Sequence, residues 1–200
     1  IHNAGVGDTF TAWLTTDGLP LVFAVNVLAS YLLTALMHRP ARLVYLSSSM
    51  HFHSRPTALE NACSDQSWTG SMSYSQSKFL VTLLAFAVAR KWPDVKSNAV
   101  DPGWVPTRMG GRSAPDDLQL GCETQAALAE TGEESGAYFH HRQARQPDPD
   151  TRNVEVQDQL LALCHRVSGT GFPAPSVGGN WGRHSLEATG QRKFLNATIM

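Results

Sequence analysis

The 200-residue chain has little cysteine, no excess of either charge and no block of like charges. Its cysteines are odd in number and widely spaced, which argues against a disulfide framework and against a metal-binding Cys-x-x-Cys pair; they are Cys63, Cys122 and Cys164. Lys and Arg number 16 and Asp and Glu 17, so nothing in the charge indicates nucleic acid or an anionic membrane surface as a partner. The low cysteine usage fits a reducing compartment, and we expect a cytoplasmic location.

The sequence also lacks a convincing membrane span. No basic-then-apolar leader follows Ile1, so no signal peptide is predicted. The longest uncharged run covers residues 19–37, close to the roughly 20 apolar residues that a span needs. Pro20, Asn26 and Ser30 interrupt it, and a helix buried against a sheet is therefore the better interpretation.

The remaining patterns alternate between short strands and longer helices. Apolar runs predict strands over 41–46, 95–100 and 136–140, and helices over 74–91, 116–130 and 154–167. This alternation is typical of an α/β domain with a parallel sheet. Residues 50–73 are polar and irregular, as in a loop that borders a ligand. His51 and His53 lie in it, but no carboxylate or thiol stands at ligand spacing, so no metal site is predicted.

Tyr74 and Lys78 form the most informative pair of the sequence. Four residues apart in a helix, they share one face. A phenol is a weak acid at neutral pH, and a neighbouring ammonium favours its ionised form and lowers its pKa. The spacing therefore indicates a proton-transfer pair, although the same spacing also suits an exposed pair at a helix start.

Further signals precede and follow this pair in a fixed order. They are Asn3-Ala4-Gly5, then Asn26 inside the uncharged run, Ser48 after the strand 41–46, and Pro102-Gly103 with Thr107 after the strand 95–100. With Tyr-x-x-x-Lys among them, residues 1–173 resemble the short-chain dehydrogenase/reductase family, most closely its retinol-dehydrogenase-like branch. The resemblance implies a doubly wound, Rossmann-like parallel sheet and an NAD(P)-dependent oxidoreductase that interconverts a carbonyl and an alcohol by hydride transfer.

The resemblance also implies roles for individual residues. Tyr74 would be the general acid/base, Ser48 would orient the substrate oxygen, Lys78 would lower the tyrosine pKa and bind the nicotinamide ribose, and Asn26 would sustain a proton relay. Because Ser47, Ser48 and Ser49 are consecutive, the assignment to Ser48 allows an error of one residue. NAD or NADP would be bound by Asn3, Ala4, Gly5, Tyr74, Lys78, Pro102, Gly103 and Thr107. The substrate would be a small, hydrophobic carbonyl compound or alcohol.

One family feature has no counterpart here: no segment matches Thr-Gly-x-x-x-Gly-x-Gly, which brings the backbone close to the cofactor pyrophosphate. We therefore expect the C-terminal part of the family domain over 1–173, with the N-terminal strands missing, and a disordered tail over 174–200. The alternative function is a truncated, catalytically silent member that at most binds a partner. Family members commonly pair through the helices of Asn26 and Tyr74, so a homo-oligomer is also expected.

Overall fold

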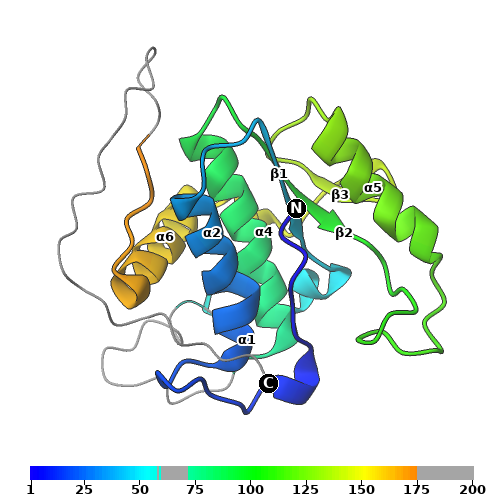
Figure 1. Ribbon diagram of the computed structural model, residues 1–200, viewed down its shortest axis with the longest axis horizontal. Coiled ribbons are helices and arrows are strands. Elements are labelled where there is room, and N and C mark those ends of the chain that lie inside the picture. Colours follow the sequence, from blue (N-terminus) through cyan, green and yellow to red (C-terminus); the bar gives the residue numbers. More distant parts are fainter. Residues whose placement is uncertain (58, 60–71, 175–200) are drawn as a thin grey trace.

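The computed structural model describes residues 1–57, 59 and 72–174, and a four-stranded sheet lies at its centre (Figure 1). The strands, hydrogen-bonded in this order, are β1 Arg42–Leu46, β2 Lys96–Asp101, β3 Tyr138–His140 and β4 Gln143–Arg145. The first three are parallel, and β4 pairs with β3 in the antiparallel sense. On the other side of β1, His2 forms a parallel bridge with Tyr45.

The described helices are α1 Leu21–Phe23, the π-helical turn Ala24–Leu28, α2 Ala29–Leu36, α4 Tyr74–Lys91, α5 Leu118–Glu130 and α6 Val154–Ser168. Helix α4 connects β1 to β2 and α5 connects β2 to β3, whereas α1 and α2 precede β1 and α6 follows β4. Short 3-10 helices span Asp8–Phe10, Ser49–His53 and Pro149–Arg152. In Figure 1, α2, α4 and α6 lie on one side of the sheet and α5 on the other, so the sheet is covered on both faces.

The side chains of the strands alternate between two cores, because successive residues of a strand point to opposite faces. Leu43 and Tyr45 pack into the large core with α4 and α6. Val44 and Leu46 pack into a smaller one with Leu128 of α5. Burial on both faces explains why β1 is continuously apolar after Arg42.

Helix α4 lies in the middle of the large core. Its largely apolar composition explains this position. Every residue from Ser77 to Val88 is buried, and a helix that is apolar all round is stable only when other elements surround it. A capping box fixes its first turn: the Ser73 hydroxyl accepts from the Gln76 N–H, and the Gln76 side chain accepts from the Ser73 N–H. This cap sets the helix to begin at Tyr74.

Most of the predicted architecture is confirmed. The α/β class, the parallel sheet and helix 74–91 are as expected, and the other predicted helices and strands differ by one or two residues at their ends. Strand β4, the three 3-10 helices and the π-helical turn within 19–37 were not predicted. Residues 58 and 60–71 of the predicted loop, and 175–200 of the predicted tail, lie outside the described residues.

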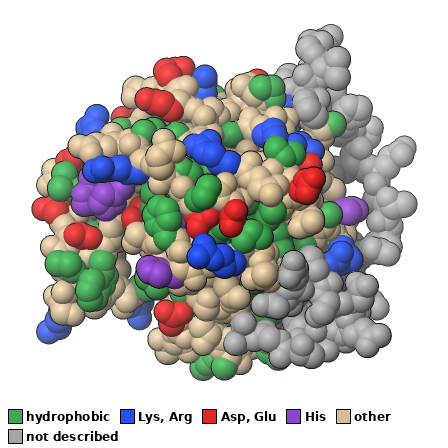
Figure 2. All heavy atoms as spheres, turned by 180° about the vertical axis from the view of Figure 1, so that it is seen from behind, with side chains coloured by type: hydrophobic (Ala, Val, Ile, Leu, Met, Phe, Trp, Pro, Cys, Tyr) green, Lys and Arg blue, Asp and Glu red, His purple; other side chains and the backbone are tan. Residues whose placement is uncertain are grey.

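The surface agrees with the balanced composition. Figure 2 shows one face on which Lys and Arg side chains are interspersed with Asp and Glu, without a patch of one sign. Within the described ranges, none of the helices is long and apolar enough to span a membrane. The same part of the chain holds no cluster of His, Cys, Asp or Glu suited to a metal ion.

Candidate active site

Three of the predicted catalytic residues meet where β1 ends and α4 begins. Ser48 follows β1 by two residues and Tyr74 is the first residue of α4. The Ser48 hydroxyl lies near the Tyr74 phenol and, by hydrogen bonding, favours its ionised form. The Nζ of Lys78 lies 5.3 Å from the centre of the Tyr74 ring. The carboxyl ends of parallel strands are where open α/β sheets bind their ligands.

The choice among the consecutive serines follows from their contacts. The Ser47 hydroxyl is buried and hydrogen-bonded to the Thr82 hydroxyl of α4 at 2.6 Å, so it belongs to the packing between β1 and that helix. Successive residues of an extended chain point in opposite directions. Ser48 therefore turns away from Thr82, and its hydroxyl reaches the Tyr74 phenol.

Burial controls the protonation of this pair. It raises the pKa of Tyr74 to about 12, and the hydrogen bond with Ser48 offsets part of that rise. Burial also lowers the pKa of Lys78 to about 8, against the attraction of Asp101. The lowered tyrosine pKa expected from the spacing is therefore not found. The ammonium lies over the face of the ring and donates to the Leu46 carbonyl at 2.6 Å. Desolvation is the largest cause of the raised phenol pKa, and the charges of Asp101 and Asp8 add to it.

Asn26 is buried in the π-helical turn and braces two other segments. Its side-chain oxygen accepts from the Val6 N–H at 2.8 Å, and its NH₂ donates to the Val6 carbonyl and to the Ser77 hydroxyl. The amide thus joins the N-terminal segment to the first turn of α4. Single π-helical turns within α-helices are frequent at functional sites, because the extra residue re-aims a side chain.

The residues expected to bind the cofactor are only partly brought to this place. A Cβ on Gly5 would lie 3.3 Å from the Asn26 side-chain oxygen and 3.8 Å from the Lys78 Nζ, so Gly5 lies beside two of the predicted catalytic residues. Asn3 and Ala4 are exposed next to it. Thr107 is also exposed, and its hydroxyl accepts from the Gly110 N–H within its own loop.

Pro102 and Gly103 follow β2 at the same edge of the sheet. Gly103 has φ +85°, a left-handed conformation that favours glycine. A Cβ there would also lie 2.6 Å from the Asp116 carboxylate. The loop therefore approaches its neighbours more closely than a larger residue would allow.

Two residues that were assigned no role from the sequence, Asp101 and His51, also lie at the site formed by Ser48, Tyr74 and Lys78. Asp101, the last residue of β2, is buried, and its charge acts on both Tyr74 and Lys78. The sequence did hold a signal for Asp101, which ends an apolar strand. An acidic residue at the end of such a strand is costly to bury without a partner. His51 is fully buried, and its Nδ1 lies 2.7 Å from the Ser48 carbonyl.

The contacts of His51 define its tautomer. Its Nε2 accepts from the Asp148 N–H at 3.0 Å and so carries no proton. Nδ1 must then carry the proton and donate it to the Ser48 carbonyl. Burial lowers the pKa of His51, which favours this neutral form. The imidazole ties the backbone of Ser48 to that of Asp148.

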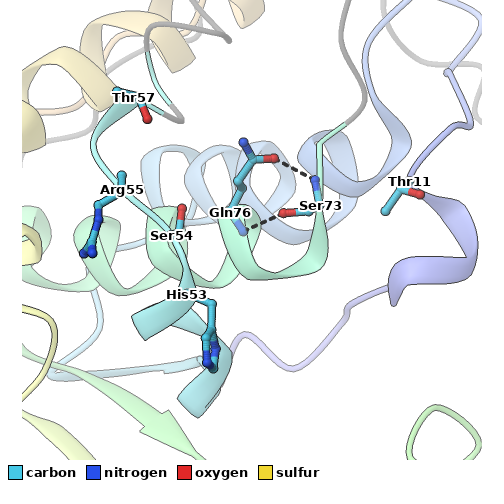
Figure 3. A pocket seen from close by; sticks show the side chains of 7 residues that line it. All are labelled: Thr11, His53, Ser54, Arg55, Thr57, Ser73 and Gln76. Atoms are coloured by element: carbon cyan, nitrogen blue, oxygen red, sulfur yellow. Dashed lines mark hydrogen bonds between the residues drawn. The ribbon is translucent and has the colours of Figure 1, made fainter.

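A pocket of about 490 Å³ borders the first turn of α4 (Figure 3). Seven described residues line it, all of them polar: Thr11, His53, Ser54, Arg55, Thr57, Ser73 and Gln76. Ser54 is buried, and among the described residues its hydroxyl has no hydrogen-bond partner. Ser73 immediately precedes Tyr74, but Ser48, Tyr74 and Lys78 are not among the described residues that line the pocket.

Comparison with known proteins gives several relatives. An uncharacterized oxidoreductase, AN7799, of Emericella nidulans is 40% identical over 182 residues, covering 86% of this chain and 69% of that protein. The short-chain dehydrogenase chyC of Penicillium rubens is 33% identical over 183 residues, covering 87% of this chain and 70% of its own length. Retinol dehydrogenase 14 of Mus musculus is 34% identical over 119 residues, 55% of this chain and 35% of that protein.

Among solved structures, an uncharacterized protein from Mycobacterium paratuberculosis superposes with a TM-score of 0.67 at 22% identity, covering 86% of this chain and 67% of its own. This likeness shows the fold. No protein-family model matches the chain. The two fungal relatives each exceed 30% identity over more than two thirds of their length, and the chain therefore belongs to the short-chain dehydrogenase/reductase family of oxidoreductases.

Proposed function

We propose that the chain carries the catalytic residues of an NAD(P)-dependent oxidoreductase that interconverts a carbonyl and an alcohol, with Tyr74 as general acid/base. The observation that carries this proposal is the contact of the Tyr74 phenol with the Ser48 hydroxyl, beneath the Lys78 ammonium. A hydroxyl and a phenol that lie this near to each other can both reach one substrate oxygen. In reduction, Ser48 would hold that oxygen while Tyr74 donates a proton to it.

The raised pKa of Tyr74 suits the reductive direction. A phenol with a pKa of about 12 is protonated at neutral pH, so it is ready to act as the acid. Lys78 and the Asn26 side chain hold the first turn of α4 to β1 and to the N-terminal segment. We assign to Asn26 a bracing role, because both donors of its amide are used in these contacts, in addition to the relay that the family suggests.

The residues present fit the nicotinamide end of NAD or NADP. Gly5 leaves space beside Asn26 and Lys78, and the left-handed Gly103 brings the backbone after β2 close to the same edge. Lys78 would bind the ribose, with Asn3, Ala4, Pro102 and Thr107 around it. A bound nicotinamide supplies or accepts the hydride.

The pocket beside Ser73 favours a substrate that carries hydrogen-bonding groups. Its described lining offers hydroxyl, amide, imidazole and guanidinium groups, and the buried Ser54 hydroxyl needs a partner. This moves our expectation from a purely apolar carbonyl compound to one with a hydroxyl or carboxylate substituent. In a substrate panel, Ser54→Ala should raise KM for the substituted compounds and leave KM for unsubstituted ones unchanged.

The first experiment is a titration of the purified 200-residue chain with NADPH and with NADH, followed by nicotinamide fluorescence. Saturable binding supports the enzyme, and reduction of carbonyl substrates should then fall by at least about 100-fold in Tyr74→Phe. A chain that is folded by circular dichroism and binds neither nucleotide contradicts the proposal.

A silent binding protein is the second candidate, and one observation favours it. Within the described residues, the outer edge of β1 is paired only at His2. A sheet edge with unpaired backbone groups can associate with another chain. A folded chain that binds no nicotinamide but sediments as a dimer or larger species would favour this candidate.

A further inference from the structure

Asp101 is a buried carboxylate held in one orientation at the end of β2. It is 5% exposed. One oxygen accepts from the Gly103 N–H at 2.9 Å, and the other accepts from the Tyr138 phenol at 3.1 Å. Both donors are neutral, so they satisfy the lone pairs without compensating the charge. A buried charge of this kind is stable only when an opposite charge lies near it.

Lys78 is the matching buried cation. It is 6% exposed, and its Nζ donates to the carbonyl of Leu46. Leu46 pairs with Val100 on β2, and Asp101 is the next residue of that strand. The register therefore brings a buried ammonium and a buried carboxylate to the ends of two adjacent strands. The charge of Asp101 raises the pKa of Lys78 and opposes the lowering by burial.

The other charged and titratable groups around the site are less suited to this role. Asp8 accepts from the backbone N–H of Tyr74 and is exposed, so water screens it. The Nδ1 of His140 lies 3.5 Å from the Asp101 carboxylate and its side chain is 31% exposed. The remaining groups are His51 with Asp148 beside Ser48, Asp116 and His141 against Gly103, and the phenols of Tyr74 and Tyr138.

We propose that Asp101 is the buried counter-ion of Lys78 and a positioning residue for the Tyr74–Lys78 pair. By holding the ammonium charged at the carboxyl end of the sheet, Asp101 keeps it where the substrate and the ribose would lie. The positioning role in catalysis rests on the proposed function. The pairing of the Asp101 and Lys78 charges is independent of that function.

The first test is the titration of Lys78 by NMR, in the chain labelled with ¹³C at lysine Cε and assigned with Lys78→Arg. Asp101→Asn keeps the shape and acceptor of the side chain and removes its charge. It should raise the acid dissociation constant of Lys78 about tenfold. Asp8→Asn, the matched control, should change it by less than twofold, and so should His140→Gln. An unchanged constant in Asp101→Asn overturns the proposal.

A double-mutant cycle tests the same pairing through stability. Asp101→Asn and Lys78→Met each leave one buried charge without its partner, whereas the double variant leaves neither. We expect the double variant to unfold at a higher denaturant concentration than additivity of the single variants requires. Additive effects overturn the proposal.

A third measurement links the pair to catalysis. In a chain that reduces a carbonyl substrate, the alkaline limb of kcat should shift to lower pH in Asp101→Asn by the amount found in the Lys78 titration. Tyr138→Phe, which removes a hydrogen bond to Asp101 and keeps the charge, should leave the limb in place. If the chain binds no nicotinamide, the proposed function fails while the titration and the cycle still decide the pairing.

Discussion

The ammonium of Lys78 lies over the face of the Tyr74 ring, 5.3 Å from its centre, and donates to the Leu46 carbonyl on β1. The pair is therefore part of the contact between α4 and the sheet. Its electrostatics follow from that contact, because the core that holds the two side chains also removes them from water.

The free energy of unfolding should rise between pH 8 and pH 10.5 because of Lys78. Burial lowers its folded-state pKa to about 8 from 10.5, so in this interval the unfolded chain binds more protons than the folded one. Stability then increases with pH, by about 3 kcal/mol at most. Urea unfolding across the interval measures this rise. Lys78→Met should lose it, whereas the partly exposed Lys91→Met should keep it.

Asn26→Leu should destabilise the chain by about 3 kcal/mol. The amide makes three hydrogen bonds, to both backbone groups of Val6 and to Ser77, and their loss leaves buried polar groups without partners. Asn26→Asp retains the acceptor for the Val6 N–H and should lose less. The denaturation midpoints of the two variants provide the check. Equal losses would show that the hydrogen bond from the Val6 N–H, which only Asn26→Asp retains, contributes nothing.

Gly103→Ala should cost more stability than Gly111→Ala in the same loop. Both glycines have positive φ, +85° and +77°, so alanine is strained at either position by about 1 kcal/mol. Only at Gly103 does the new Cβ meet other atoms, at 2.6 Å from the Asp116 carboxylate, whereas nothing lies within 4 Å at Gly111. Thermal unfolding of the two variants should separate them by several degrees. A larger loss at Gly111 would contradict the geometry of this loop.

Ser54→Ala should leave the chain as stable as before or stabilise it by about 1 kcal/mol. Among the described residues the buried Ser54 hydroxyl has no partner, so its removal eliminates a desolvation cost. Ser47 is the matched control, since it is equally buried and bonded to Thr82. Ser47→Ala should cost about 1–2 kcal/mol by the same principle. Calorimetry on the two variants tests the contrast, and a loss at Ser54 as large as at Ser47 would show that its hydroxyl has a partner.

Local patterns alone determined the class and order of the elements. The largely apolar run 74–91 has the length and composition of a buried helix, and the strand 41–46 is too apolar to face water on either side, so both were predicted close to their observed bounds. The four-residue spacing also placed Tyr74 and Lys78 on one face. These features depend on backbone periodicity and on the need to bury apolar surface, which are properties of neighbouring residues.

The tertiary structure alone decided the electrostatics of the site and the identity of its further members. The choice of Ser48 over Ser47 depends on which hydroxyl faces Thr82, a residue of another element. The raised pKa of Tyr74 depends on how deeply α4 is packed, and the nearness of Asp101 to Lys78 depends on the register of β1 with β2. Burial and register arise from contacts between segments far apart in the chain, and no local spacing encodes them.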